Sequence, residues 1–172
     1  MSTWMTAEEA REMFDTFTGD LIWNTAPRYH SELLGQRAGT DNGVGYRQVQ
    51  FNRKMHKVSH IVWLIEHGKY PAEDLDHINH DRSDNRLENL RLATKEQNLA
   101  NSMLRQDNKS GYKGVGWHKQ SQKWRARVTH EGKCYFSGCF DKLEDAVAAR
   151  QKLAKELFGE FANETDNRSL VT

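Results

Sequence analysis

The sequence contains two cysteines, two prolines and no long hydrophobic run, and each shortage excludes a class of protein. Cys134 and Cys139 form no Cys-x-x-Cys pair and have no Cys/His ligand set near them, which argues against structural zinc. No segment approaches the roughly 18 apolar residues of a membrane span. The first residues also lack the basic-then-apolar pattern of a secretory signal. We therefore expect an intracellular, cytoplasmic protein with free thiols and no membrane partner.

The 172 residues, 37% of them hydrophobic, are enough for one average domain or two small ones. The net charge of +1 hides an uneven distribution. Between Arg105 and Lys133 there are eight Lys or Arg residues against Asp107 and Glu131. A basic segment of this kind favours a partner that carries phosphates.

The pattern of apolar residues, caps and turns predicts an α+β chain in two modules. The N-terminal module begins with a helix from a capping box at Thr6 to about residue 17. A strand, a long loop, a hairpin and an apolar helix from Ser59 to Gly68 follow. A ββα unit then closes this module. The predicted domains are an N-terminal module at 1–104 with its ββα core at about 75–104, a linker at 105–111, a three-stranded antiparallel sheet packed on one helix at 112–163, and a tail at 164–172.

The predicted ββα unit contains the stretch DHINHDRSDNRLENLRLATKEQN, residues 76–98, which is dense in carboxylates, amides and imidazoles. Asn and Asp favour turns, and turn chemistry is enough to explain four of these residues, Asn79, Asp81, Asp84 and Asn85. It does not explain the pair Asp76–His77 before the turn together with Asn89 and Asn98.

Those remaining four residues suit phosphodiester hydrolysis. That reaction needs a base to deprotonate water and positive charge on the phosphate and the leaving oxygen. Asp76 and Asn98 could hold one hard divalent cation, Mg²⁺ with Mn²⁺ as a substitute, through oxygen. His77 would be the base. Asn89 could accept the proton on Nδ1 of His77 and leave Nε2 as the basic atom.

Alternation in the C-terminal module separates two sheet faces. Val115, Trp117 and the alternate residues Trp124, Ala126 and Val128 are expected to pack on the helix. The open face would then be basic and thin, because it contains Gly114 and Gly116. We expect it to bind double-stranded DNA, with arginine reading base edges and lysine meeting phosphate. The candidate DNA-binding residues are Lys113, His118, Lys119, Arg125 and Arg127.

The N-terminal motifs resemble a known family. D-H-I-N from 76, D-N-R-L-E-N-L-R from 84 and T-K-E-Q-N up to 98 are similar to the HNH motif of phage homing endonucleases. The resemblance implies a nuclease with His77 as general base, Asp76 and Asn98 as metal ligands and Asn89 orienting the base. It also implies a phage-encoded protein acting inside a bacterial host.

The C-terminal motifs carry a second resemblance. GYKGV, WRARV, EGK and SGCFD before an Ala-rich helix are similar to the plant ethylene-response-factor type of DNA-binding domain. The resemblance implies DNA binding through the sheet, with Lys113, Arg125 and Arg127 at matching positions. Gly116 stands where plant members usually have Arg, which argues against a fixed base preference.

Two other interpretations stay open at this point. One is a DNA-binding regulator with an inactive HNH motif, and the other is an RNA-binding nuclease or toxin, although no paired aromatic motif of the RNA-recognition type is present. We expect no small-molecule cofactor and a monomer or weak dimer. No role is assigned to His60, His67 or His80. Further DNA contacts are expected from loop arginines 28, 37, 47 and 53.

Overall fold

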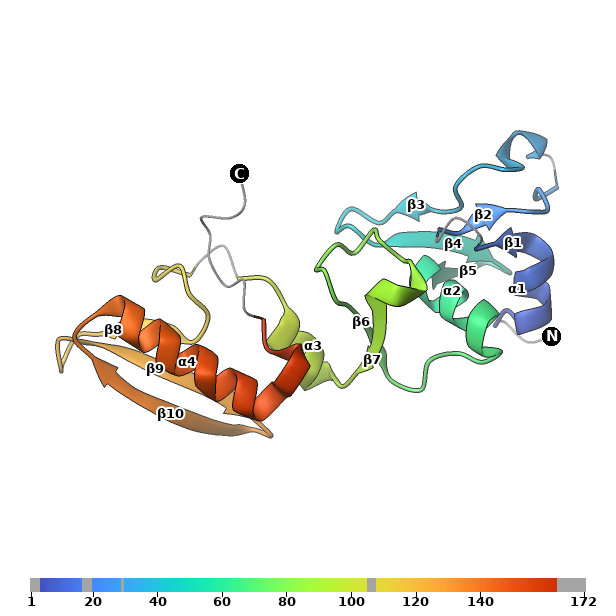
Figure 1. Ribbon diagram of the computed structural model, residues 1–172. Helices are drawn as coiled ribbons and strands as arrows, with labels where there is room; N and C mark the ends of the chain where they lie inside the picture. Colours follow the sequence, from blue (N-terminus) through green and yellow to red (C-terminus); the bar gives the residue numbers. More distant parts are fainter. Residues whose placement is uncertain (1–3, 17–19, 29, 105–107, 164–172) are drawn as a thin grey trace. The chain divides into compact units, whose positions relative to one another are not determined.

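The computed structural model describes residues 4–16, 20–28, 30–104 and 108–163 (Figure 1). The chain mixes helices with small sheets and divides into two compact units, Met1–Ala93 and Thr94–Thr172. The predicted tail and residues 105–107 of the predicted linker lie outside the described residues. Among the described helices, none has the length and hydrophobicity that crossing a membrane requires.

The N-terminal unit begins with helix α1 (Ala7–Met13), where Thr6 makes both hydrogen bonds of the predicted capping box. The helix ends before the predicted residue 17, because the chain turns into an extended segment, β1 (Phe14–Asp15). This strand pairs antiparallel with β2 (Ile22–Trp23).

A three-stranded sheet follows, in the order β3 (Thr40–Asp41), β4 (Arg47–Phe51) and β5 (Lys54–Lys57). Strands β4 and β5 form the predicted hairpin, with Gln48 opposite Lys57. Its two turn residues, Asn52 and Arg53, have φ angles of 48° and 62°, in the left-handed region.

The apolar helix α2 (Val58–His67) begins slightly earlier than predicted. Lys57 is at the N-cap position, while Ser59 is buried inside the first turn and caps nothing. Gly68 ends the helix in the left-handed conformation, as the sequence predicts. The buried side of α2 contributes to the core of this unit. Residues in or just before α1, β1, β2 and β4 pack with it, namely Met5, Ala10, Phe14, Leu21 and Val49.

The chain then forms a two-stranded hairpin of β6 (Asp74–His77) and β7 (Leu90–Ala93). Strand β6 begins at Asp74, two residues before the polar stretch 76–98. The twelve residues between the strands form a polar loop that ends in a short 3₁₀ helix, η2 (Leu87–Asn89). This loop and the end of β6 contain three of the predicted site residues.

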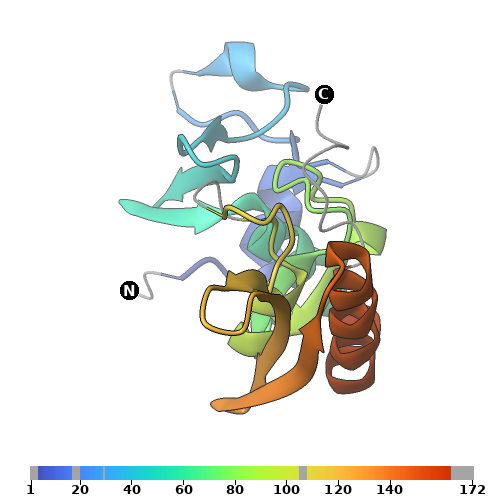
Figure 2. The ribbon, with the colours of Figure 1, turned by 90° about the vertical axis from the view of Figure 1, so that its left-hand side faces the viewer.

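The C-terminal unit contains a three-stranded antiparallel sheet in the order β10-β9-β8, with a long helix on one face (Figure 2). Its register pairs Gly116 with Arg125 and Phe136 with Arg127. The elements of this unit are α3 (Lys95–Asn101), β8 (Val115–His118), β9 (Lys123–His130), β10 (Lys133–Phe140), α4 (Leu143–Phe158) and the 3₁₀ helix η3 (Gly159–Phe161).

The faces of β9 divide as alternation predicts, since Ala126 and Val128 are buried and Arg125 and Arg127 are exposed. Trp117 differs from its prediction, because 45% of its surface is exposed. Strand β8 is at the edge of the sheet, and the indole packs edge-on against Trp124 without being covered by α4.

The start of α4 also differs from the sequence pattern, which predicts Asp141 as its cap. Lys142 holds the N-cap position and makes no capping hydrogen bond through its side chain. The carboxylate of Asp141 instead pairs with Lys123 of the neighbouring strand.

Helix α3 belongs to the C-terminal unit, so the chain divides earlier than residue 104. A capping box of Thr94 and Gln97 starts this helix. At its other end the ammonium of Lys113 donates to the carbonyls of the last turn. Near its beginning, Glu96 accepts a hydrogen bond from the backbone of Glu131 at 2.6 Å and lies 3.4 Å from His130. These contacts explain why α3 groups with the sheet that follows it.

Candidate active site

His77 is the last residue of β6 and is 5% exposed. The pKa of its imidazole is lowered from the usual value near 6.5, chiefly because burial disfavours the charged ring. The hydrogen bond with Asn85 and the carboxylates of Asp76, Asp81 and Asp84 act in the opposite direction, and more weakly than burial. His77 is therefore a neutral imidazole at pH 7, the form that a general base requires.

Asn85, in the loop after β6, sets the tautomer of this ring. Its amide nitrogen donates to the carbonyl of Ser83 at 3.1 Å, which turns its oxygen toward His77. That oxygen lies 3.2 Å from Nε2 of His77, so Nε2 carries the proton and donates it to Asn85. In this tautomer the lone pair is on Nδ1. The sequence predicts that Asn89 bonds Nδ1 and leaves Nε2 as the base. In the structure the partner is Asn85 instead of Asn89, and the nitrogen that it bonds is Nε2 instead of Nδ1.

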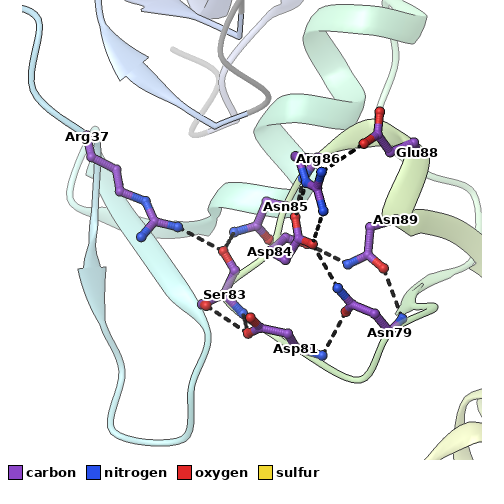
Figure 3. Close-up of polar contacts among 9 residues, drawn as sticks. All are labelled: Arg37, Asn79, Asp81, Ser83, Asp84, Asn85, Arg86, Glu88 and Asn89. Atoms are coloured by element: carbon purple, nitrogen blue, oxygen red, sulfur yellow. Dashed lines mark hydrogen bonds and ion pairs between the residues drawn. The ribbon is translucent and has the colours of Figure 1, made fainter.

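Asn89 instead holds the loop between β6 and β7 closed, as Figure 3 shows. Its side-chain oxygen accepts from the backbone N–H of Asn79 at 2.9 Å, and its amide donates to the carbonyl of Asp84 at 2.8 Å. Because Asn89 is 6% exposed, these two bonds satisfy backbone groups near a buried position. The residue therefore supports His77 indirectly, by fixing the loop that contains Asn85.

The other predicted turn residues form a chain of hydrogen bonds within the same loop (Figure 3). Asn79 accepts from the backbone of Asp81 and donates to Asp84, and Asp81 accepts from the backbone and hydroxyl of Ser83. The guanidinium of Arg86 grips both oxygens of Asp84 at 2.8 Å, which lowers the pKa of that carboxyl to about 2. These carboxylates are therefore ionised, and their oxygens are used within the loop.

Asp76 lies opposite Arg91 in the β6–β7 register. Both Nε and Nη2 of Arg91 lie 2.9 Å from Oδ2 of Asp76, and the carboxylate is 4% exposed. A buried carboxylate is stable only with a partner of opposite charge. Arg91 supplies that charge, and oxygen is the donor that Mg²⁺ prefers, so the chemistry of Asp76 fits the predicted cation.

Asn98, the second predicted metal ligand, is in the first turns of α3 and so belongs to the C-terminal unit, whereas Asp76, His77 and Asn89 belong to the N-terminal unit. Its backbone N–H donates to the carbonyl of Thr94, as a regular helix requires. Over the described ranges, no three His, Cys, Asp or Glu side chains gather as a metal cluster.

The open face of the C-terminal sheet contains a groove of about 300 Å³ that is lined by Arg125, Arg127, His118 and the glycines 114 and 116, among others. Arg125 lies 5.4 Å from the ring of Phe136, which is 56% exposed. Lys119 is exposed beyond the end of β8, and His118 bonds the hydroxyl of Ser121 at 2.8 Å. Four of the five predicted DNA-binding residues thus lie at this face or its edge.

Lys113, the fifth predicted DNA-binding residue, has its ammonium bound to the end of α3. Its ammonium makes bonds of 2.5–3.1 Å to three backbone carbonyls and one hydroxyl, those of Leu99, Ala100 and Ser102. A cation at the carbonyl end of a helix is favourable because the carbonyls there lack partners in the helix. Its role in the structure is to fasten α3.

Two of the three histidines without a predicted role, His67 and His80, have a structural role. His67 stacks on Trp63 with ring centroids 3.9 Å apart, and its Nδ1 donates to the Trp63 carbonyl. Burial lowers the pKa of His60. His80 has a φ of 66° and forms part of the tight turn after β6.

The sequence analysis did not single out Arg91, Phe136 or Asn85 for these roles, and the sequence patterns that could have identified them differ in strength. Arg91 could have been found, because pairing the predicted strands places it opposite Asp76. Phe136 could have been found from alternation in β10, since it pairs with Arg127 on the open face. Asn85 could not, because nothing in a run of turn-forming residues says which side chain folds back onto His77.

Comparisons with known proteins find similarity over the part of the chain that contains these residues. The family model described as HNH endonuclease matches residues 56–100, a range that contains His77, Asn85, Asn89 and Asn98. Protein 3.8 of Escherichia phage T7 is 38% identical over 102 residues, which cover 59% of this chain and 84% of that protein. The Uncharacterized HNH endonuclease L560 of Acanthamoeba polyphaga mimivirus is 34% identical over 110 residues, covering 63% of this chain and 56% of the relative. No solved structure matches the chain.

Proposed function

On the premise that this chain belongs to the family of Protein 3.8 of Escherichia phage T7 and carries an HNH endonuclease domain at residues 56–100, we propose that it is a metal-dependent endonuclease of the homing type that hydrolyses phosphodiester bonds in double-stranded DNA. One observation carries the proposal. Within the HNH match, His77 is a buried, neutral imidazole whose proton is held on Nε2 by Asn85.

His77 would act through Nδ1. In the tautomer set by Asn85, Nδ1 carries the lone pair and can accept a proton from water as the water oxygen attacks phosphorus. The bond between phosphorus and the 3′ oxygen breaks, and that oxygen takes up a proton from solvent. The hydrogen bond from Nε2 to Asn85 keeps the ring in one orientation, as in other sites where a second group orients a histidine.

A divalent cation would bind through hard oxygen donors suited to Mg²⁺ or Mn²⁺, for which the sequence predicts the carboxylate of Asp76 in the N-terminal unit and the amide of Asn98 in helix α3. When bound, such an ion stabilises negative charge on the phosphate and on the leaving oxygen. Arg91 orients the carboxylate of the buried Asp76 through its two bonds to Oδ2.

The C-terminal unit would bind DNA through Arg125, Arg127, His118 and Lys119 on and beside its open sheet face. The exposed arginines and the glycines between them suit close approach to a DNA groove. Tethering by this unit raises the local concentration of DNA near the nuclease domain, so a small site can act on few positions.

The test is incubation of the pure protein with supercoiled plasmid and Mg²⁺, with and without EDTA, beside the variants His77→Ala and His30→Ala. We expect wild type and His30→Ala, which removes an exposed imidazole of the same unit, to relax or linearise the plasmid. EDTA and His77→Ala should each abolish cleavage. DNA that stays intact with wild type under Mg²⁺ and Mn²⁺ on varied targets, while binding persists, would favour a DNA-binding regulator instead.

A further inference from the structure

A cluster of one aromatic ring and two cations lies beside His77. The ring of Tyr46 has its centroid 5.9 Å from that of His77. Arg82 lies 4.9 Å from the centroid of Tyr46, and the ammonium of Lys57 lies 5.0 Å from it. Tyr46, Lys57 and Arg82 are called the Tyr46 cluster below.

Three separate segments hold the cluster in place. Tyr46 ends a tight turn in which the side chain of Asn42 accepts from the backbone of Val44 and of Tyr46. Lys57 is at the end of β5, opposite Gln48 in the register. Arg82, from the loop after β6, donates to the carbonyl of Val44 at 3.1 Å and so ties that loop to the turn.

The two cations of the cluster are not neutralised by acidic residues. Within the part of the chain that the structure describes, neither Lys57 nor Arg82 forms an ion pair, and both are exposed. Five other arginines of this unit are occupied internally: Arg11 by Ile65, Arg37 by Asp20 and Ser83, Arg47 by Ala38 and Gly39, Arg86 by Asp84 and Glu88, and Arg91 by Asp76. Arg82 also donates to a backbone carbonyl, that of Val44, but among the described residues no acidic side chain neutralises its charge or that of Lys57, which leaves both charges available to an anion.

Three carboxylates, those of Asp76, Asp81 and Asp84, act on the ring of His77. Arg91 pairs with Asp76 and Arg86 pairs with Asp84, so the Tyr46 cluster adds positive charge that these ion pairs do not cancel. Both cations lie about 5 Å from the Tyr46 ring, so they are within about 10 Å of each other. Successive phosphates of one strand rise about 3.4 Å along the helix axis, so two cations this close can reach neighbouring phosphates.

We propose that the Tyr46 cluster is a binding site for the DNA backbone, in which Lys57 and Arg82 contact phosphates that flank the bond to be cut. Tyr46 holds both cations over its ring and packs against the sugar or base between those phosphates. The assignment rests on the proposed function for the identity of the cut strand. The binding of phosphate itself can be tested without cleavage.

The test measures binding of the full-length chain carrying His77→Ala to a fluorescent 30-base-pair duplex of mixed sequence, over 50 to 200 mM salt. Lys57→Gln, Arg82→Gln and the double variant are compared with Lys69→Gln, which removes an exposed cation of the same unit outside the cluster. Each lost phosphate contact lowers the slope of log K against log salt by about 0.9. The ratio of Kd at the two salt limits should therefore fall about threefold for each single variant and about tenfold for the double variant.

Two further variants separate binding from structure. Arg82→Lys keeps the charge and should keep the salt slope, whereas a role limited to the Val44 bond would lower the melting temperature and leave the slope of Arg82→Gln unchanged. Tyr46→Phe should behave as wild type, and Tyr46→Ala should weaken binding. Unchanged slopes in Lys57→Gln and Arg82→Gln would overturn the site even if the wild type cuts plasmid. Lowered slopes without any cleavage by wild type would retain the phosphate site and refute the nuclease proposal.

Discussion

The side-chain oxygen of Asn85 lies 3.2 Å from Nε2 of His77, at a position where both residues are buried. The second hydrogen bond of Asn85, to the carbonyl of Ser83, means that its amide cannot rotate without losing a partner. The pair therefore fixes both the orientation and the tautomer of the imidazole. A neutral acceptor does this without adding a charge that would raise the pKa of His77.

Replacing Asn85 by Asp should move the pH dependence of cleavage. Burial holds the pKa of His77 below 6.5, so the wild-type rate should fall only when the pH drops below about 6.5. A carboxylate beside Nε2 favours the imidazolium and raises the pKa of His77. The acid limb of kcat/KM should therefore move to higher pH in Asn85→Asp. The profile is measured from pH 5 to 8 on a plasmid substrate, and an unmoved limb would contradict the assignment of His77 as base.

Replacing Asn89 by Ala should act on stability rather than on that pH profile. The change leaves the backbone N–H of Asn79 and the carbonyl of Asp84 without their buried partner. Losses of this kind cost about 2 kcal/mol in the free energy of unfolding. The urea midpoint should fall and the remaining activity should keep the wild-type acid limb. If the limb moves as it does in Asn85→Asp, then Asn89 contacts the base directly, as the spacing predicts.

The helices and strands of this protein could be predicted from the sequence because the patterns that indicate them are local. Capping boxes at Thr6 and Thr94, the glycine at 68 and the alternation of β9 all depend on neighbours within a few residues. The resemblance to the HNH motif predicts His77 as the base for a similar reason, since the motif is a short pattern within the sequence.

The contacts among those elements could not be predicted, because they depend on how side chains fold back in space. A run of Asn and Asp predicts a turn without saying that Asn85 meets His77 and Asn89 meets the backbone. Lys113 looks like a phosphate ligand in a basic strand, and only the packing of α3 reveals the carbonyls that it binds. The sequence therefore predicts the chemistry of these side chains, but it does not predict which groups they bind.

Acid should destabilise the N-terminal unit below about pH 6.5. Burial is the largest cause that lowers the pKa of His56, His60 and His77 in the folded state. Between the lowered values and 6.5 the unfolded chain binds more protons, so stability rises with pH across that window and is lost as pH falls. Urea midpoints at pH 7.5, 6.5 and 5.5 test this. His56→Phe should flatten the dependence, because Nε2 of His56 is buried without a partner among the described residues.

Replacing Arg125 and Arg127 together by Ala should weaken DNA binding and flatten its salt dependence. Both side chains are exposed on the open sheet face and line its groove. If each contacts a phosphate, the slope of log K against log salt falls by about 1.8. Replacing Lys155, on the helix α4, by Ala is the matched control for loss of positive charge. A slope equal to that of the wild type would remove this face from the DNA interface.

Replacing Lys113 by Met separates its two possible roles. The change removes the donor from three carbonyls at the end of α3, and hydrogen bonds from a charged group contribute about 2 kcal/mol. Amide hydrogen exchange in residues 95–101 should therefore become faster, while the exposed control Lys109→Met leaves it unchanged. The salt slope of DNA binding should stay at the wild-type value, because the ammonium of Lys113 is used inside the protein. A slope lowered by about 0.9 with unchanged exchange would instead make Lys113 the phosphate ligand that the sequence pattern predicts.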